Sequence, residues 1–304
     1  MGRLDAHMTM DVCRARLVRG MAIWLTVMAG STLSLARQAP SGSPLAGILA
    51  AGGAYVAEYQ RQIAAIGCEE KLHESAGFAA LSGGGPREPT LRSDVVWIDG
   101  ESAGWIGLRD VFEVDGASVR PRDDRLAKVL MLGAPGALDN ARRMVQEGTR
   151  HHIGNVNRSI NTPMHALSFL RLDNQARSAF SFDGMKTVDR IKVGLVVFRE
   201  RSMPRVLRTA GDAAAEGKLW IEPDSGRVVR SELVLKADGV TATIAVRYAS
   251  EPKLGLWLPV RLDEEYATVT TPAPITSSGR PPVNGQADYR DCRKLDVDVS
   301  RIIG

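Results

Sequence analysis

The sequence has few cysteines, few aromatic residues and no recognisable catalytic motif. Its 304 residues include three cysteines, and aromatic side chains make up 5% of the chain. The nucleophile elbow G-x-S-x-G is absent, and the glycines at 83–85 are not followed by the Lys and Ser or Thr of a phosphate-binding loop. The sequence therefore indicates neither a hydrolase with a nucleophile elbow nor a P-loop protein.

Metal-binding and acylation motifs are missing as well. Ser250–Lys253 matches S-x-x-K in letters, but it lies in a Pro-containing turn and the partner motifs S-D-N and K-T-G are absent. His151 and His152 are adjacent, so on a helix they would point about 100° apart instead of sharing a face as zinc ligands do. We interpret them as cations in the last turn of a helix that ends at Gly154. We expect neither a metal nor a cofactor.

Charge is nearly balanced along the chain. The formal net charge is +4, and residues 1–36 hold four arginines against two aspartates. In the remainder, Lys and Arg alternate with Asp and Glu and form no cluster. A nucleic-acid-binding surface needs several cations on one face. The sequence shows no such stripe, so we expect no nucleic-acid partner.

An apolar run near the N-terminus is short. Three arginines within residues 14–19 precede the run MAIWLTVMAG at 21–30, and a small-x-small cleavage site ends at Ala36. The alternative, a membrane anchor, needs about 20 mostly apolar residues. We therefore expect a signal peptide over residues 1–36 and a mature protein outside the cytoplasm, in the periplasm or secreted. Membrane contact would then be limited to the signal peptide or be transient.

Two cysteines remain after removal of Cys13 with the signal peptide. In an oxidising compartment Cys68 and Cys292 can pair, although two free or buried thiols are an equally good interpretation. Cys68 opens the first predicted strand and Cys292 lies in the last one. A disulfide forms if the sheet brings these strands together.

The mature chain is predicted to contain a flexible tether at 37–44 and a single β-rich domain at 45–304. Apolar residues spaced by three and four predict a helix over 45–66. Helical spacing returns in an insertion at about 123–170, and the Pro- and Gly-containing segment 271–285 is predicted to be a mobile loop.

Most of the remaining sequence alternates as antiparallel strands do. Asp99-Gly100 and Asp115-Gly116 are hairpin signals, because both central positions of such turns need positive φ. The predicted strands cover 68–75, 95–98, 105–114, 191–197, 218–221, 227–236, 240–248, 258–262 and 286–299. We expect a β-rich α+β fold: a single curved antiparallel sheet, an open half-barrel, with the N-terminal helix and the helical insertion covering one face.

Adjacent acidic residues occur at Glu69-Glu70 and Glu264-Glu265. Neighbouring residues on a strand face opposite ways, so neither pair is an acid–base dyad by itself. We assign no catalytic residue, and the sequence favours a binding protein over an enzyme.

Four tryptophans remain in the mature chain, all in predicted strands. We predict that Trp105, Trp220 and Trp257 include residues that line a concave apolar pocket. Core packing is the alternative, since aromatic side chains supply much of the buried area of a sheet.

Several stretches resemble a group of exported bacterial proteins: LRSDVVWI at 91–98, GWIGLRDVFEVDG at 104–116, GKLWIEPDSGRVVRSEL at 217–233 and LGLWLPV at 254–260. The strand order, the long N-terminal helix and the W-I-x-P-x-x-G-R hairpin are also similar to lipoprotein-carrier domains of the LolA/LolB type. In those domains an open half-barrel holds acyl chains against covering helices. The resemblance implies an envelope binding protein whose partner is an apolar small molecule, such as a lipid, or a lipoprotein. No functional residue of that family has a motif that can be placed here.

Two other functions stay open. An envelope hydrolase would use the region from His151 to His165 together with Asp123 or Asp124. A structural component of a surface assembly would be recognised through an exposed strand edge.

The signal-peptide hypothesis has a direct test. N-terminal sequencing of protein recovered from the cell envelope should begin at Arg37, within a few residues, because cleavage follows the small-x-small site. Membrane-bound protein that still carries the run at 21–30 would contradict the prediction.

Overall fold

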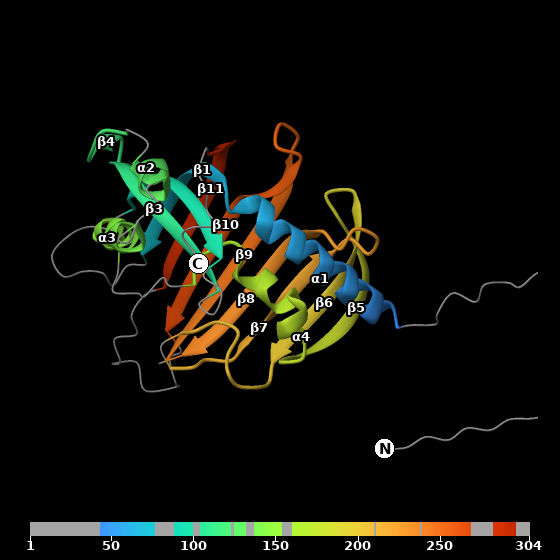
Figure 1. Cartoon of the computed structure of the whole chain (residues 1–304). Helices are drawn as coiled ribbons and strands as arrows, with labels where there is room; N and C mark the ends of the chain where they lie inside the picture. The colour runs from blue at the N-terminus through green and yellow to red at the C-terminus, as the bar shows by residue number, and fades with distance from the viewer. Residues whose placement is uncertain are drawn as a thin grey trace, which may run out of the picture. The chain divides into compact units, whose positions relative to one another are not determined.

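The strands form one open antiparallel sheet. The computed structural model describes residues 43–76, 88–99, 104–122, 125–131, 137–153, 160–209, 211–237, 239–268 and 282–295. Within these residues, 11 strands pair in the order β4-β3-β2-β1-β11-β10-β9-β8-β7-β6-β5 (Figure 1). Since β4 and β5 end the order and do not pair with each other, the sheet is a half-barrel and not a closed barrel. The predicted fold class is confirmed. The predicted signal peptide and most of the tether and the loop at 271–285 lie outside the described residues.

The strands are long and follow one another as hairpins through the second half of the chain. Their bounds are β1 Ile66–Ala76, β2 Thr90–Asp99, β3 Trp105–Val114, β4 Ala117–Ser118, β5 Ser178–Val188, β6 Ile191–Glu200, β7 Ala215–Ile221, β8 Val228–Ala237, β9 Val240–Glu251, β10 Leu256–Thr268 and β11 Val283–Lys294. β11 lies between β1 and β10 and so joins the N-terminal strands of the sheet to the C-terminal ones. The sequence analysis missed β5, where Gly184 at φ +81° and a register shift between Phe182 and Met185 interrupt the alternation.

One face of the sheet carries the main core, and we call it the inner face. Alternation along β7 shows the pattern. Leu219 and Ile221 are fully buried on the inner face, while Lys218 and Trp220, which alternate with them, are less buried. The opposite face is the outer face. Period-two alternation thus separates an apolar side from a mostly polar one.

Helix α1 (Pro44–Ile63) crosses the inner face (Figure 1). Its buried residues recur at three- and four-residue steps, which is the pattern of an amphipathic helix: Ile48, Gly52, Gly53, Val56, Tyr59 and Ile63. Near its start Ile48 approaches Gly194 of β6, and near its end Tyr59 packs 6.5 Å from the ring of Trp105 of β3. The helix therefore spans the sheet from β6 to β3. Among the described helices, none is long and apolar enough to cross a membrane.

The helical insertion divides between the two faces. Helices α2 (Arg125–Met131) and α3 (Ala137–Thr149) pack on the outer face, where Leu126 and Met144 form a second core with Val96 and Leu108. The 3-10 helix η2 (His165–Leu170) and helix α4 (Leu172–Gln175) lie on the inner face beside α1. Helical spacing predicts these segments but does not tell which face of the sheet they cover.

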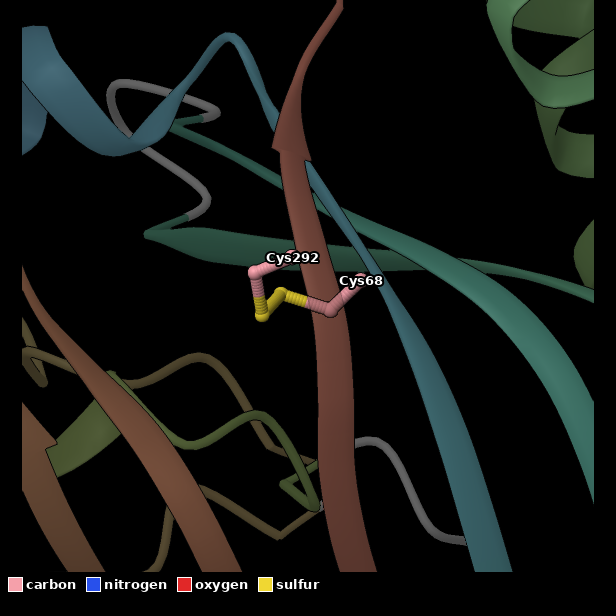
Figure 2. Close-up of a disulfide and its surroundings, with 2 residues drawn as sticks. All are labelled: Cys68 and Cys292. Carbon is pink, nitrogen blue, oxygen red and sulfur yellow. A yellow bond between two sulfur atoms is a disulfide. The ribbon is translucent and has the colours of Figure 1, made fainter. Parts of the chain in front are cut away.

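A β-bulge brings the two cysteines together. Gly67 pairs with Arg293 and Glu69 with Arg290, so one residue of β1 faces two residues of β11. The extra residue is Asp291 at φ +47°, and it turns Cys292 toward the core that contains Cys68. The two sulfur atoms are bonded at 2.03 Å, with Cα atoms 4.0 Å apart (Figure 2).

The bridge would join residues 224 positions apart in the sequence. In the chain-entropy model such a loop is worth about 5 kcal/mol of unfolding free energy, an upper figure because denatured-state structure reduces it. We expect no free thiol from Cys68 or Cys292 when the denatured mature protein is titrated. Reduction should lower the melting temperature by about 10 °C.

The matched control for this measurement is the double variant Cys68→Ala/Cys292→Ala. Its melting temperature should equal that of the reduced protein and should not respond to reductant. Two titratable thiols in the untreated mature protein would show that the cysteines are unpaired.

Candidate functional site

The three predicted ligand-binding tryptophans lie on different parts of the sheet. Trp105 lies on the inner face and is 2% exposed in the main core. Trp257, near the start of β10, packs against that core while the guanidinium of Arg227 lies 4.4 Å over its ring. Trp220 alternates with Leu219 and Ile221 and therefore lies on the outer face, so it cannot line a ligand on the inner face.

Charged side chains gather on the inner face near the β3 end of the sheet. Glu70, Glu74 and Glu264 are 1%, 0% and 3% exposed. Arg109 and His152 lie against two of them. We call these five residues the buried charged cluster. Burial of charged groups is costly unless they are paired and hydrogen-bonded, so each contact is informative.

Arg109 joins β3 to β1 and to the segment that follows α3. Its Nε donates to Glu70 Oε2 at 2.7 Å, and its two terminal nitrogens donate to the side-chain and main-chain oxygens of Asn161 at 3.2 and 3.0 Å. Burial lowers the pKa of Arg109, but Glu70, Tyr289 and Glu264 together raise it above its ordinary value. Burial, and then the charge of Glu70, raises the pKa of the neighbouring Tyr289 far above its usual range.

Gly107 provides the space that this arrangement needs. A Cβ at Gly107 would lie 3.0 Å from a terminal nitrogen of Arg109 and 3.1 Å from the hydroxyl of Thr162. Both groups can lie over the glycine because it has no side chain, and a side chain at this position would crowd them. The segment around Asn161 and Thr162 is thereby held against β3.

Glu74 holds the residues after α3 in the same way. Its Oε2 accepts from the backbone N–H of Ile153 at 2.8 Å, and its Oε1 contacts Nδ1 of His152. The interpretation of His152 as a helix-capping cation is therefore wrong: α3 ends at Thr149, and the His152 side chain reaches β1. For His151, burial first and then Arg120 lower the pKa.

Two carboxylates bracket one glycine on the inner face. Gly285 of β11 pairs with Glu74 on β1 and with Glu264 on β10. The carboxylate of Glu264 lies over Gly285, where a Cβ would collide with it, and accepts from the Tyr266 hydroxyl at 3.1 Å. Glu74 and Glu264 therefore lie on either side of Gly285, one strand away from it in each direction.

The sequence analysis missed the buried charged cluster. It predicted that Glu69 and Glu70 face opposite ways, and the structure shows Glu69 bound to arginines of the outer face and Glu70 in the core. The available signal was a charge at an inward position of an apolar alternation, as in Cys68, Glu70, Leu72. The sequence does not tell which residues of different strands contact one another, because that depends on the strand register.

The cluster functions as a polar anchor and shows no catalytic constellation. Its contacts tie His152 and Ile153 to β1, and Asn161 to β3. Asp123 and Asp124, the acids of the hydrolase alternative, lie outside the described residues, and His165 is buried in η2. In the described part of the chain, no three His, Cys, Asp or Glu side chains are arranged to hold a metal ion.

No family model and no curated protein matches the chain. Among solved structures, a putative outer membrane lipoprotein-sorting protein domain from Vibrio parahaemolyticus has a TM-score of 0.39 and 9% identity, covering 85% of this chain and 96% of that one. A DUF1329 family protein from Desulfovibrio piger has a TM-score of 0.39 and 11% identity, and the match covers 86% of this chain and 98% of that one. The MucA/MucB complex of Pseudomonas aeruginosa has a TM-score of 0.21 and 10% identity, and the match covers 81% of this chain and 99% of that one.

These three solved structures share little sequence with the chain, and their TM-scores lie at 0.39 or below. The likeness concerns the arrangement of the chain and not its ligand.

The Arg109–Glu70 pair can be tested by unfolding. Arg109→Met leaves Glu70 buried without its cation, and we expect a loss of about 3–5 kcal/mol of unfolding free energy. In Arg109→Met/Glu70→Gln the loss should be smaller, because no uncompensated charge remains. Denaturation in urea measures the unfolding free energy of both variants.

Arg92 provides the control for this pair. It bonds Glu69 and Glu113 on the outer face and is 35% exposed, so Arg92→Met should cost about 1 kcal/mol or less. Equal losses for the Arg109 and Arg92 variants would contradict the anchoring role of the buried pair.

Proposed function

We propose that this protein is an exported binding protein of the cell envelope that holds an apolar ligand, such as a lipid or a lipoprotein acyl chain, against the inner face of its half-barrel. The observation that carries the proposal is an apolar inner face that α1, η2 and α4 cover through mostly apolar contacts. Two features of the described residues support it: the composition of that face, and the way in which α1 and its neighbours are attached.

The inner face is apolar over most of its width. From β6 to β11, side chains that are at most 3% exposed form a continuous surface: Val196, Phe198, Leu219, Leu233, Ile244, Val246, Leu262 and Ala287. An extended hydrocarbon chain gains about 0.8 kcal/mol for each methylene group that it buries on such a surface. A ligand of this class therefore needs no specific polar partner along the strands.

Apolar contact dominates the attachment of α1. Its glycines allow close approach: a Cβ at Gly52 would lie 3.3 Å from Leu170, and a Cβ at Gly53 would lie 2.7 Å from Leu172. One side-chain hydrogen bond joins α1 to α4, from Gln175 Nε2 to the Leu49 carbonyl at 3.0 Å. Since the contact is mostly apolar, an acyl chain can replace it without leaving many polar groups unpaired.

The core under this cover is filled by side chains. Tyr59 of α1 and Phe169 of η2 are among the fully buried residues, with Trp97 on the sheet. A ligand would therefore enter by displacing α1 or the segment of η2 and α4. The ligand and the cover then compete for the same surface, and loosening the cover should strengthen binding.

Lipid binding is measured by two experiments on the mature protein. Organic extraction and mass spectrometry of protein purified from its envelope should yield a lipid. In solution, a fluorescent fatty acid should bind to delipidated protein with saturation and change the tryptophan emission, because Trp105 lies beneath α1. A clean extract together with no spectral change across a saturating titration would overturn the proposal.

Two glycine variants in the same helix test the cover. Gly53→Ala should bind the fatty-acid probe several-fold more tightly, because the added methyl group pushes α1 away from α4. Gly47→Ala is the matched control, since a Cβ there meets no atom within 4 Å. Identical probe affinities for the two variants would show that α1 is not the cover.

A further inference from the structure

Three arginines lie side by side on the outer face. Arg230 on β8 pairs with Arg247 on β9, and Arg247 pairs with Arg261 on β10. The residues next to them along the strands point into the core: Ser231, Val246 and Leu262. We call Arg230, Arg247 and Arg261 the arginine row. Adjacent strands are about 4.8 Å apart, so the row crosses three strands within about 10 Å.

This arrangement breaks a local rule of sheet stability. Like charges directly opposite each other on neighbouring strands are destabilising, and the row contains two such pairs. Arg261 is compensated by Asp263 and Asp288 at 3.1 and 2.8 Å. Arg247 is exposed and forms no ion pair or hydrogen bond with the residues that the structure describes. Repulsion in the row is therefore only partly relieved by the residues that the structure describes.

An aromatic side chain ends the row. Trp220 on β7 pairs with Arg230, whose guanidinium lies 4.9 Å over its ring, and on the other side it pairs with Leu195 of β6. Tryptophan has an apolar body and a polar N–H, and it is enriched where proteins meet the interface between membrane and water. Amphipathic helices that bind anionic lipids also combine Lys or Arg with Trp.

The expectation that the chain has no stripe of cations is wrong for the folded protein. In the sequence each of these arginines stands among acidic or apolar residues. The sheet register brings them together from three strands, and register cannot be read from composition.

We propose that the arginine row binds the anionic head groups of a lipid membrane, with Trp220 entering the interface at its end. This inference rests on the proposed function, because a protein that takes up or delivers an acyl chain must meet a membrane. The row favours a membrane over a peptide for a geometric reason. Extended peptides bind at sheet edges or in grooves, whereas these side chains project from the broad face of central strands.

Vesicle flotation tests the row. The protein should bind vesicles of phosphatidylglycerol and phosphatidylcholine more tightly than vesicles of phosphatidylcholine alone, and added salt should weaken binding. In Arg230→Gln/Arg247→Gln the partition coefficient should fall about 25-fold, since each cation near an anionic surface contributes about fivefold. The blue shift of tryptophan emission on binding should be lost in Trp220→Phe.

The control variant is Arg208→Gln/Lys192→Gln. It removes the same charge from two exposed positions outside the row, and it should bind anionic vesicles within about twofold of the unmodified protein. Equal loss in the two double variants, or equal binding to both vesicle types, would overturn the proposal. Release from vesicles by millimolar inorganic phosphate at constant ionic strength would also overturn it and assign the row to a small phosphate ligand, and binding to polyglutamate but not to vesicles would assign it to an acidic peptide.

A separate readout distinguishes this inference from the proposed function. The Arg230→Gln/Arg247→Gln variant should take up the fluorescent fatty acid from solution as the unmodified protein does, because the row lies on the outer face. Loss of vesicle binding with normal probe uptake supports both statements. Normal vesicle binding in that variant overturns the proposed role of the arginine row and does not affect the proposed binding of an acyl chain to the inner face.

Discussion

The sheet does not close on itself, so its apolar inner face has to be covered by other parts of the same chain. A closed barrel would bury that face by its own curvature, but here β4 and β5 remain at opposite ends of the strand order. Among the described residues, the cover consists of α1, of residues 152–153 after α3, and of residues 160–175 with η2 and α4. Most of the other features of the structure follow from how this cover is attached.

Attachment differs between the two ends of the sheet. Near β1 and β3 the cover is fixed by directional polar contacts, from Arg109 to Asn161 and from Ile153 to Glu74. Only two residues separate α1 from β1 there. Near β6 the contact is apolar, with Ile48 against Gly194. Apolar contacts are non-directional, so under the proposed function the cover would loosen at the β6 end while the β3 end stays in place.

The buried charged cluster is better explained by positioning than by stability. A buried ion pair seldom contributes net stability, because desolvation of both partners offsets their attraction. The Glu70 carboxylate and the Arg109 guanidinium nevertheless require one geometry, and an apolar pair in their place would tolerate many. The cluster therefore specifies where Ile153 and Asn161 dock on the sheet.

The sequence predicted those features that depend on local pattern. Alternation predicted the sheet, and three- and four-residue spacing predicted α1, because each pattern follows from the geometry of a single element. Features that depend on strand register were not predictable: the placement of Glu74 and Glu264 on either side of Gly285, and the alignment of Arg230, Arg247 and Arg261. A charge at an inward position, such as Glu70, was visible, but its partner on another strand was not.

β-bulges decide which side chains reach which face. On β10, Pro259 pairs with Tyr248 and Arg261 with Arg247, so Val260 is an extra residue. Without this extra residue, period-two alternation would pair Val260 with Arg247 and turn Arg261 toward the core.

The bulge at Asp291 acts on β11 in the same manner, because it turns Cys292 toward Cys68. One inserted residue on each of two strands thus completes the arginine row outside the sheet and aligns the two cysteines inside it. Bulges are therefore the positions at which this fold converts an ordinary alternating sheet into one with distinct chemistry on each face.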